Sequence, residues 1–151
     1  LCIEHMLPRE DPRDCLILSA ALASHVQRGV CDDLSAMLAA LPSNVRIGTS
    51  SVRRAAFLRH LRPDIEIVPL RGNVQTRIDK LEAGQVDITL LALAGLNRLG
   101  LSARADVILS AGAMLPSAGQ GAVGIEIRQK DADIAEIFAA ISCRETVLRV
   151  K

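Results

Sequence analysis

The chain has 151 residues, half of them hydrophobic, and a formal net charge of +1. This length allows one ordinary domain with a core and excludes two full domains unless one of them is a fragment. The small net charge excludes a global basic field of the kind that attracts nucleic acid or an anionic membrane. Because the only aromatic residues are two phenylalanines, the core must be aliphatic, and the composition favours layered α/β architecture.

The first 14 residues are dense in charge and proline, which predicts a surface connection between an opening strand and the next element. Residues 15–22 form an apolar run that fits either a strand or a helix. Asp32 or Asp33 is a candidate N-cap for a short helix that ends before Pro42, because a carboxylate there accepts hydrogen bonds from the amides of the first turn.

Residues 45–99 alternate regularly between strand and helix patterns. The predicted elements lie at residues 45–49, 51–60, 65–70, 73–83, 86–93 and 95–99. We expect the first helix to be amphipathic, with Val52, Ala55, Ala56 and Leu58 or Arg59 on neighbouring turns. Two consecutive βα units imply a parallel sheet with right-handed crossovers, and ligands then belong at the carboxyl ends of its strands.

The remaining residues carry shorter signals. We expect strands over 107–109 and 122–127, and helices over 133–141 and 143–150. The glycine-rich stretch 119–124 has neither the order of a dinucleotide motif nor the Lys-Ser/Thr of a P-loop, so no nucleotide site is predicted. Its glycines suit a tight turn, or a hinge or backbone contact with a ligand, and the sequence leaves both open.

Cysteine and histidine spacing gives no metal or redox motif. The four cysteines form no Cys-x-x-Cys pair, which favours reduced thiols in a cytoplasmic protein. Cys2 and His5 lie three apart without a second ligand pair, so we predict no metal site. The most apolar run, residues 88–96, is about half of what a membrane span needs, so we expect neither a membrane nor a nucleic-acid partner.

The first candidate site is the junction between the strand over 45–49 and the helix over 51–60. It reads Gly48-Thr49-Ser50-Ser51-Val52-Arg53-Arg54. Its hydroxyls can cap the helix while free backbone amides point at a ligand. Arg53 and Arg54 fall in the first turn, where positive charge opposes the helix dipole and is unfavourable without an anion. The junction therefore predicts an anion site, with a plain serine cap and solvated arginines as the alternative.

A second junction repeats this arrangement about twenty residues later. It reads Pro69-Leu70-Arg71-Gly72-Asn73-Val74-Gln75-Thr76-Arg77. Gly72 permits close backbone approach, and Arg77 lies one turn into the helix. Two adjacent basic strand ends predict a site for several carboxylates or phosphates, which paired guanidinium groups bind well. Arg98, after the third strand, could add a further guanidinium or decorate the helix surface.

Taken in order, six blocks of the chain resemble the hydroxymethylbilane synthase family, also called porphobilinogen deaminase. The blocks are Arg9-Glu10-Asp11-Pro12-Arg13-Asp14, residues 48–54, 70–77, 94–101 and 115–126, and Glu145-Thr146-Val147-Leu148-Arg149. The chain is identified as an internal fragment that lacks the N-terminal part of domain 1 and most of domain 3. Residues 1–16 would then end a domain 1 segment, 17–116 form domain 2, 117–141 return to domain 1, and 142–151 begin domain 3.

The resemblance implies a cytoplasmic, monomeric transferase of tetrapyrrole (haem) biosynthesis. Its first two domains would resemble a type II periplasmic binding protein, with a parallel or mixed sheet and flanking helices. It would join four porphobilinogen molecules through linear oligopyrrole intermediates to 1-hydroxymethylbilane, with release of ammonia. A dipyrromethane cofactor, covalently attached to a cysteine, would prime the chain.

The resemblance also assigns site residues. Arg53, Arg54, Arg71 and Arg77 match arginines that bind cofactor and substrate carboxylates, and Arg98 matches another basic site residue. Thr49, Ser51, Asn73 and Gln120 match polar contacts to the cofactor, and we include Ser50 between them.

Three features depart from the family pattern. The family's Gly-Gly-Cys cofactor loop and its catalytic aspartate have no counterpart in these residues, and Cys143 lies where the family does not attach the cofactor. Asn97 replaces a residue that is often basic. We therefore expect binding residues without turnover in the isolated chain.

Two alternatives stay open from the sequence alone. One is a non-catalytic module of the periplasmic-binding type for a small polycarboxylate. The other is a fragment that does not fold alone because parts of it lack partner strands.

Overall fold

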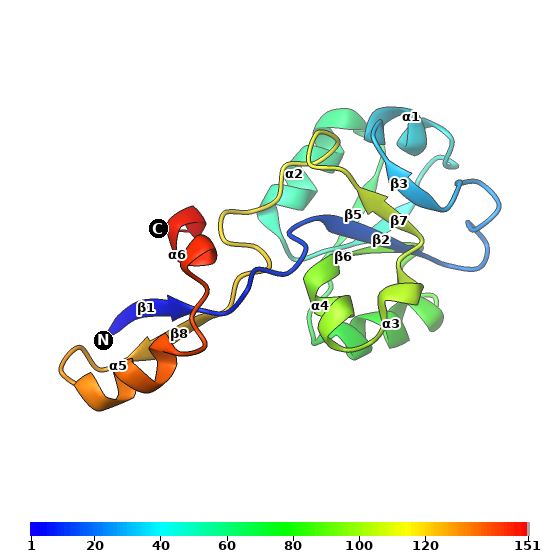
Figure 1. Ribbon diagram of the computed structural model, residues 1–151. Coiled ribbons are helices and arrows are strands. Elements are labelled where there is room, and N and C mark those ends of the chain that lie inside the picture. The colour runs from blue at the N-terminus through cyan, green and yellow to red at the C-terminus, as the bar shows by residue number, and fades with distance from the viewer. Residues whose placement is uncertain (151) are drawn as a thin grey trace. The chain divides into compact units, whose positions relative to one another are not determined.

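The computed structural model describes residues 1–150, which fall into two compact units (Figure 1). Unit 2 runs from Arg13 to Pro116, and unit 1 is formed by Leu1–Pro12 together with the residues from Ser117 onward. The chain therefore enters unit 2 after Pro12 and leaves it after Pro116. The predicted division into domains of a longer protein stays a prediction.

Unit 2 is built on a six-stranded sheet with the order β3-β7-β2-β6-β4-β5. Its strands are β2 (Asp14–Leu18), β3 (Gly29–Cys31), β4 (Arg46–Gly48), β5 (Glu66–Val68), β6 (Ile88–Ala92) and β7 (Val107–Leu109). β4 pairs in parallel with both β5 and β6, whereas β2 is antiparallel to its neighbours β6 and β7. The predicted α/β class is confirmed, and of the parallel or mixed sheet that we expected, the structure has the mixed form.

Helices follow the strands of unit 2 as the alternating pattern predicted. They are α1 (Leu34–Ala39), α2 (Val52–Leu61), α3 (Val74–Glu82), α4 (Leu93–Arg98) and the 3-10 turn η1 (Ser102–Arg104). Of the two candidate caps for the first helix, Asp33 is the one used, since its carboxylate accepts from the amide of Ala36 at 2.9 Å. The apolar run after the opening connection is strand β2 and not a helix.

The sheet of unit 2 has an apolar layer on each face. Leu16 and Leu18 of β2 belong to one buried cluster, and the alternating residues Cys15 and Ile17 belong to the other. The first cluster includes side chains of α1 and α2, and the second includes side chains of α3 and α4. Helices thus cover both faces (Figure 1), which is why β2 and β6 are apolar along nearly their whole length.

Two expectations about burial were wrong. Asp14 was placed in a surface connection, yet it opens β2 and is completely buried. Val52 was expected on the packed surface of α2, yet it is 85% exposed, while Arg54 is only 8% exposed. An aliphatic side chain outside and a guanidinium inside is the reverse of what hydrophobic burial favours, so a specific polar partner must hold Arg54.

Unit 1 contains a two-stranded antiparallel sheet and two helices. Its elements are β1 (Cys2–Met6), β8 (Gly124–Ile127), α5 (Ala132–Ala139) and α6 (Arg144–Val150). The opening strand, the strand after the glycine-rich loop and both late helices are confirmed. Gly121 has a φ of +87°, and a Cβ there would lie 2.3 Å from the carbonyl oxygen of Glu10, so this loop requires glycine for close backbone approach.

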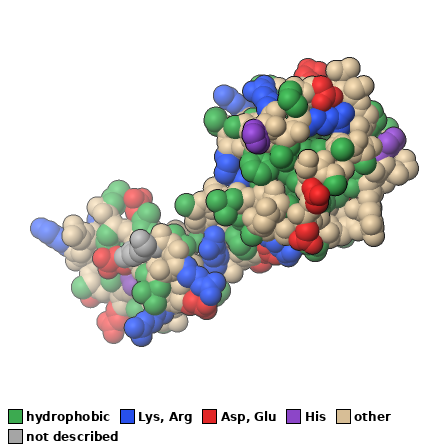
Figure 2. All heavy atoms as spheres, turned by 90° about the horizontal axis from the view of Figure 1, so that it is seen from above, with side chains coloured by type: hydrophobic (Ala, Val, Ile, Leu, Met, Phe, Trp, Pro, Cys, Tyr) green, Lys and Arg blue, Asp and Glu red, His purple; other side chains and the backbone are tan. Residues whose placement is uncertain are grey.

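Charged side chains of both signs are interspersed on the face drawn in Figure 2, in keeping with the small net charge. Across residues 1–150, none of the helices has the length and apolar character that a membrane span requires. The same residues bring together no group of three or more His, Cys, Asp or Glu side chains that could hold a metal ion.

Candidate functional site

Both predicted junctions lie at one edge of the sheet in unit 2. β4 and β5 are parallel neighbours, and α2 and α3 begin a few residues after these strands end. The carboxyl ends of parallel strands meet at the same edge, so the polar residues of the two junctions are brought together there. Gly48 allows this close packing, since a Cβ on it would lie 2.8 Å from Cδ2 of Leu70.

The hydroxyls of the first junction shape its turn. Thr49 is buried, donates its amide to the carbonyl of Val68 at 3.0 Å, and accepts the amide of Ser51 on its Oγ1 at 3.1 Å. Of the three hydroxyl residues that could cap α2, Ser51 is the N-cap, and its Oγ accepts from the amide of Arg54 at 3.4 Å. Ser50 is exposed. Thr49 and Ser51 thus fix the backbone from which the two arginines project.

Arg54 is held inside the fold by Asp14. Its Nε and Nη2 donate to Oδ1 of Asp14 at 3.2 and 2.6 Å, and its Nη1 donates to the carbonyl of Leu90 at 3.1 Å. The side chain of Arg54 is 9% exposed and that of Asp14 is 0% exposed. This is a buried, charge-assisted pair, in which either partner alone would be strongly unfavourable.

Arg53 contacts the other oxygen of the same carboxylate. Its Nη2 donates to Oδ2 of Asp14 at 2.7 Å, and its Nη1 donates to the carbonyl of Leu115 at 2.7 Å. The side chain stays 30% exposed. The anion that the first turn of α2 requires is therefore supplied, at least in part, by unit 2 itself.

Sequence reasoning missed Asp14. A signal was present, because an acid at the start of a fully apolar strand has to find a partner when it is buried. Its partners lie 39 and 40 residues further along the chain, a separation at which local patterns carry no information.

The second junction is organised by Asn73, the N-cap of α3. Its Oδ1 accepts from the amide of Thr76 at 2.8 Å and from the Thr76 hydroxyl at 2.9 Å. Gly72, with a φ of +125°, adopts a backbone conformation that side chains disfavour. Arg71 is exposed, and its carbonyl accepts from Nζ of Lys80 at 2.9 Å.

Arg77 lies one turn into α3 and differs from the arginines of the first junction. Its Nε donates to the carbonyl of Gly72 at 2.9 Å, and it forms no ion pair within residues 1–150. Its pKa is lowered, first by partial burial and second by the positive charge of Arg54. A bound anion would counteract both causes. It would accept hydrogen bonds from the guanidinium in place of water, and its negative charge would offset the repulsion from Arg54.

Arg54 and Arg77 line one open pocket of about 280 Å³. The pocket is completed by the start of α3 and by the junction of β6 with α4, and its lining residues are Arg54, Gly72, Asn73, Val74, Arg77, Leu91, Ala92 and Gly95. A guanidinium that has no acidic partner in residues 1–150, beside the N-terminus of a nine-residue helix, is an arrangement suited to a carboxylate or phosphate.

The other predicted site residues lie elsewhere. Arg98 is exposed in the last turn of α4, and neither it nor Arg53 or Arg71 lines this pocket. Gln120 belongs to unit 1, where its Nε2 donates to the carbonyl of Pro12 at 2.6 Å and its carbonyl accepts from Nε of Arg9 at 3.0 Å.

Comparison with known proteins identifies the family. Residues 1–136 match the family model described as "Porphobilinogen deaminase, dipyromethane cofactor binding domain". The chain belongs to the porphobilinogen deaminase family. It is 45% identical over 150 residues to the porphobilinogen deaminase of Sorangium cellulosum, and 47% identical over 140 residues to that of Nitrobacter hamburgensis. These alignments cover 99% and 93% of this chain, but only 45% and 40% of the relatives.

The chain therefore spans less than half the length of these porphobilinogen deaminases. This partial coverage agrees with the fragment that the resemblance predicted. The alternative of a non-catalytic polycarboxylate module is not favoured.

Among solved structures, the chain is similar to an amino acid ABC transporter substrate-binding protein from Streptococcus pneumoniae bound to L-arginine. The identity is 14% and the TM-score is 0.45, over 88% of this chain and 50% of that one. A similarity this low indicates neither a ligand nor a function for this chain.

Proposed function

We propose that the full-length protein containing this chain is a hydroxymethylbilane synthase. In this proposal it joins four porphobilinogen molecules into 1-hydroxymethylbilane, releases ammonia and acts in tetrapyrrole biosynthesis in the cytoplasm. The observation that supports this most strongly is the family match across residues 1–136, in a family described by its cofactor-binding domain.

The role of this chain would be to bind carboxylates of the cofactor and of the growing pyrrole chain. Arg53, Arg54, Arg71 and Arg77 are the proposed carboxylate ligands, with Arg98 as a further basic contact. Thr49, Ser50, Ser51, Asn73 and Gln120 are the proposed polar contacts. The pocket beside Arg77 supports this, since a planar guanidinium suits a carboxylate in charge and in geometry.

The chemistry of these donors fits a dipyrromethane cofactor. When bound, the cofactor would supply the primer on which porphobilinogen units are joined. Arg77 would bind one of its carboxylates, because within residues 1–150 it has no acidic partner to displace. Arg54 would contribute its positive charge from the wall of the same pocket, where its guanidinium is already fixed to Asp14.

Substrate, intermediates and oligomeric state belong to the same proposal. Porphobilinogen and linear oligopyrroles would be the partners of the full-length protein, which we expect to be a monomer. The isolated chain would bind without turnover, because the cofactor cysteine and the catalytic aspartate of the family have no counterpart in it.

The proposal is tested on the protein encoded by the complete reading frame. We expect it to consume porphobilinogen with release of ammonia, and to show an intact mass that exceeds the polypeptide by one covalent dipyrromethane. A protein with neither consumption nor added mass would contradict the proposal.

A further inference from the structure

A single buried carboxylate organises the first junction. Asp14 contacts Arg54 through Oδ1 and Arg53 through Oδ2, so both of its oxygens are engaged by guanidinium groups. The carboxylate lies at the start of β2, paired across the sheet with Ala92 at the end of β6, and is completely buried. Its own position is therefore set by the centre of the sheet and not by a mobile loop.

We propose that Asp14 is a positioning residue for the carboxylate site: it holds the Arg54 charge beside the pocket and fixes the Arg53 guanidinium group in the orientation that receives a ligand. This inference rests on the proposed function, because it concerns how the same arginines bind. The long arginine side chain has many rotamers, and fixing its planar group in advance reduces the loss of side-chain entropy that ligand binding must offset.

The two arginines share this carboxylate unequally. Arg54 uses Nε, Nη1 and Nη2 in contacts within unit 2 and is almost fully buried, so it mainly fixes Asp14 and contributes charge to the pocket. Arg53 donates one hydrogen bond from each terminal nitrogen and stays 30% exposed. With five N–H groups and two of them used, Arg53 keeps donors for a ligand.

Arg53 also contacts both ends of unit 2. Asp14 follows the point where the chain enters the unit after Pro12, and Leu115 precedes the point where it leaves after Pro116. One guanidinium therefore holds the entry and exit segments of the unit together beside the site. A displaced Arg53 would affect the geometry of these two segments as well as ligand binding.

Positioning and simple electrostatics predict opposite results when the Asp14 charge is removed. Asp14→Asn raises the positive charge of the cluster by one, so electrostatics alone would strengthen binding of an anionic substrate and increase its sensitivity to salt. Loss of positioning would weaken binding, because the guanidinium groups would no longer be held in place. The sign of the change in KM therefore distinguishes the two.

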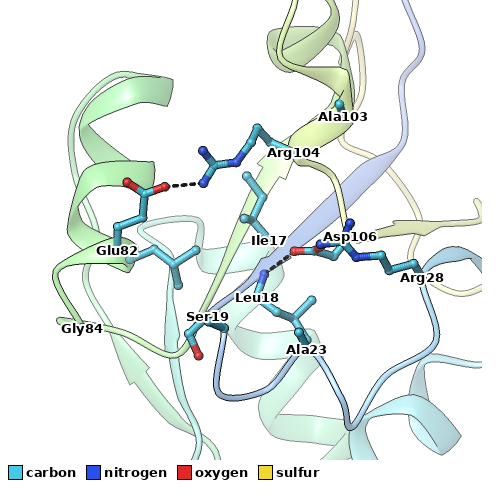
Figure 3. Close-up of a pocket in the computed structure, with 12 residues that line it drawn as sticks. Ile17, Leu18, Ser19, Ala23, Arg28, Glu82, Gly84, Ala103, Arg104 and Asp106 are labelled. Carbon is cyan, nitrogen blue, oxygen red and sulfur yellow. Dashed lines mark hydrogen bonds and ion pairs between the residues drawn. The ribbon is translucent and has the colours of Figure 1, made fainter.

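Asp106 offers a control elsewhere in unit 2. It directly precedes β7, is 8% exposed, accepts from the amide of Leu18 at 2.8 Å and pairs with Arg28 at 2.5 Å. Asp106 lines a separate pocket of about 560 Å³. Figure 3 shows it beside Arg28, while Arg104 and Glu82, which line the same pocket, extend toward each other from η1 and α3. Asp106→Asn thus removes an arginine-paired, buried aspartate away from the predicted ligand site.

The test measures the kinetics of the full-length holoenzyme with porphobilinogen, alongside thermal unfolding. We expect Asp14→Asn to raise KM by about tenfold to a hundredfold, as misplaced binding groups do, while Asp106→Asn, whose partner Arg28 is an exposed arginine, leaves KM unchanged. A KM for Asp14→Asn that is unchanged or lower would overturn the positioning role. If the wild-type protein shows neither turnover nor cofactor mass, the proposed function fails instead.

Asp14→Glu is the second test variant, for use if Asp14→Asn does not fold. It keeps the charge but moves the carboxylate by one methylene, so the net charge of the cluster is preserved while the guanidinium groups shift. A raised KM in Asp14→Glu supports positioning, and a wild-type KM in a folded Asp14→Glu protein overturns it.

Discussion

The two strand-to-helix junctions of unit 2 have similar sequences and opposite electrostatic states. At the junction of β4 with α2, both arginines contact the buried carboxylate of Asp14. At the junction of β5 with α3, Arg77 donates to the carbonyl of Gly72 and has no acidic partner in residues 1–150, and its pKa is lowered by burial and by Arg54. The two junctions look equivalent in sequence but differ in structure. The first holds its arginines on a buried carboxylate, and the second has an arginine without an acidic partner in residues 1–150.

This difference indicates how a polyanion site can be stable before its ligand arrives. If every arginine lacked a partner, their mutual repulsion in a half-buried pocket would oppose folding. If every arginine were fully paired, little positive charge would remain for the ligand. One carboxylate shared by two arginines leaves a net positive charge and keeps it in place.

The largest expected loss of stability comes from removing the Asp14 carboxylate that pairs with the arginines of the first junction. Asp14→Asn leaves the buried Arg54 without a counter-charge, so the free energy of unfolding should fall by about 3 kcal/mol. Urea unfolding of the full-length protein measures this. Arg71→Gln, at an exposed arginine of the second junction, is the control, and its change should stay within about 0.5 kcal/mol. Equal changes in the two variants would mean that the junctions do not differ as described.

A second prediction concerns the backbone of the second junction. Gly72 has a φ of +125°, and a Cβ there would lie 2.8 Å from Cβ and Cγ2 of Thr76. Gly72→Ala should therefore cost about 2 to 3 kcal/mol of stability. Gly84→Ala is the matched control, because Gly84 has a φ of +70° but open space around it, and it should cost about 1 kcal/mol. Equal thermal shifts for the two would argue against the contact with Thr76.

Removing the helix caps should change stability less, but the change should differ between the two junctions. Asn73 accepts at 2.8 and 2.9 Å from Thr76, whereas Ser51 accepts at 3.4 Å from Arg54. We expect Asn73→Ala to cost about 1 kcal/mol and Ser51→Ala about 0.5 kcal/mol, both read from urea midpoints. A larger loss for Ser51→Ala would reverse the order that the hydrogen-bond distances imply.

The smallest change in stability is expected for Arg77. Arg77→Gln removes a partly buried cation that has no acidic partner in residues 1–150, so the free energy of unfolding should change by no more than about 0.5 kcal/mol. Binding should respond much more, with a rise in KM for porphobilinogen of about tenfold, since a hydrogen bond to a charged group is lost. An unchanged KM would exclude Arg77 from the site.

Much of this fold could be predicted because its signals are local. Ser51 and Asn73 were expected to begin their helices and are the N-caps of α2 and α3. The succession of strand and helix patterns located β4, β5 and β6, and a short apolar segment located β7, to within a few residues. The three-residue strand β3 was missed, since so short a segment has no periodicity of its own.

The parts that could not be predicted depend on pairing across the sheet. β2 lies between β6 and β7 and is antiparallel to both, which no pattern within residues 14–18 indicates. The same pairing brings Asp14 beside Arg53 and Arg54. The arginines were therefore correctly selected as candidates, while the acid that holds them was placed on the surface.

A crystal structure of the full-length protein with its cofactor bound would test the central claim most directly. We predict that cofactor carboxylates lie within hydrogen-bonding distance of Arg77 and Arg53, while Asp14 still contacts Arg53 and Arg54. Carboxylates bound away from both junctions, or an Asp14 that no longer contacts either arginine, would contradict the account.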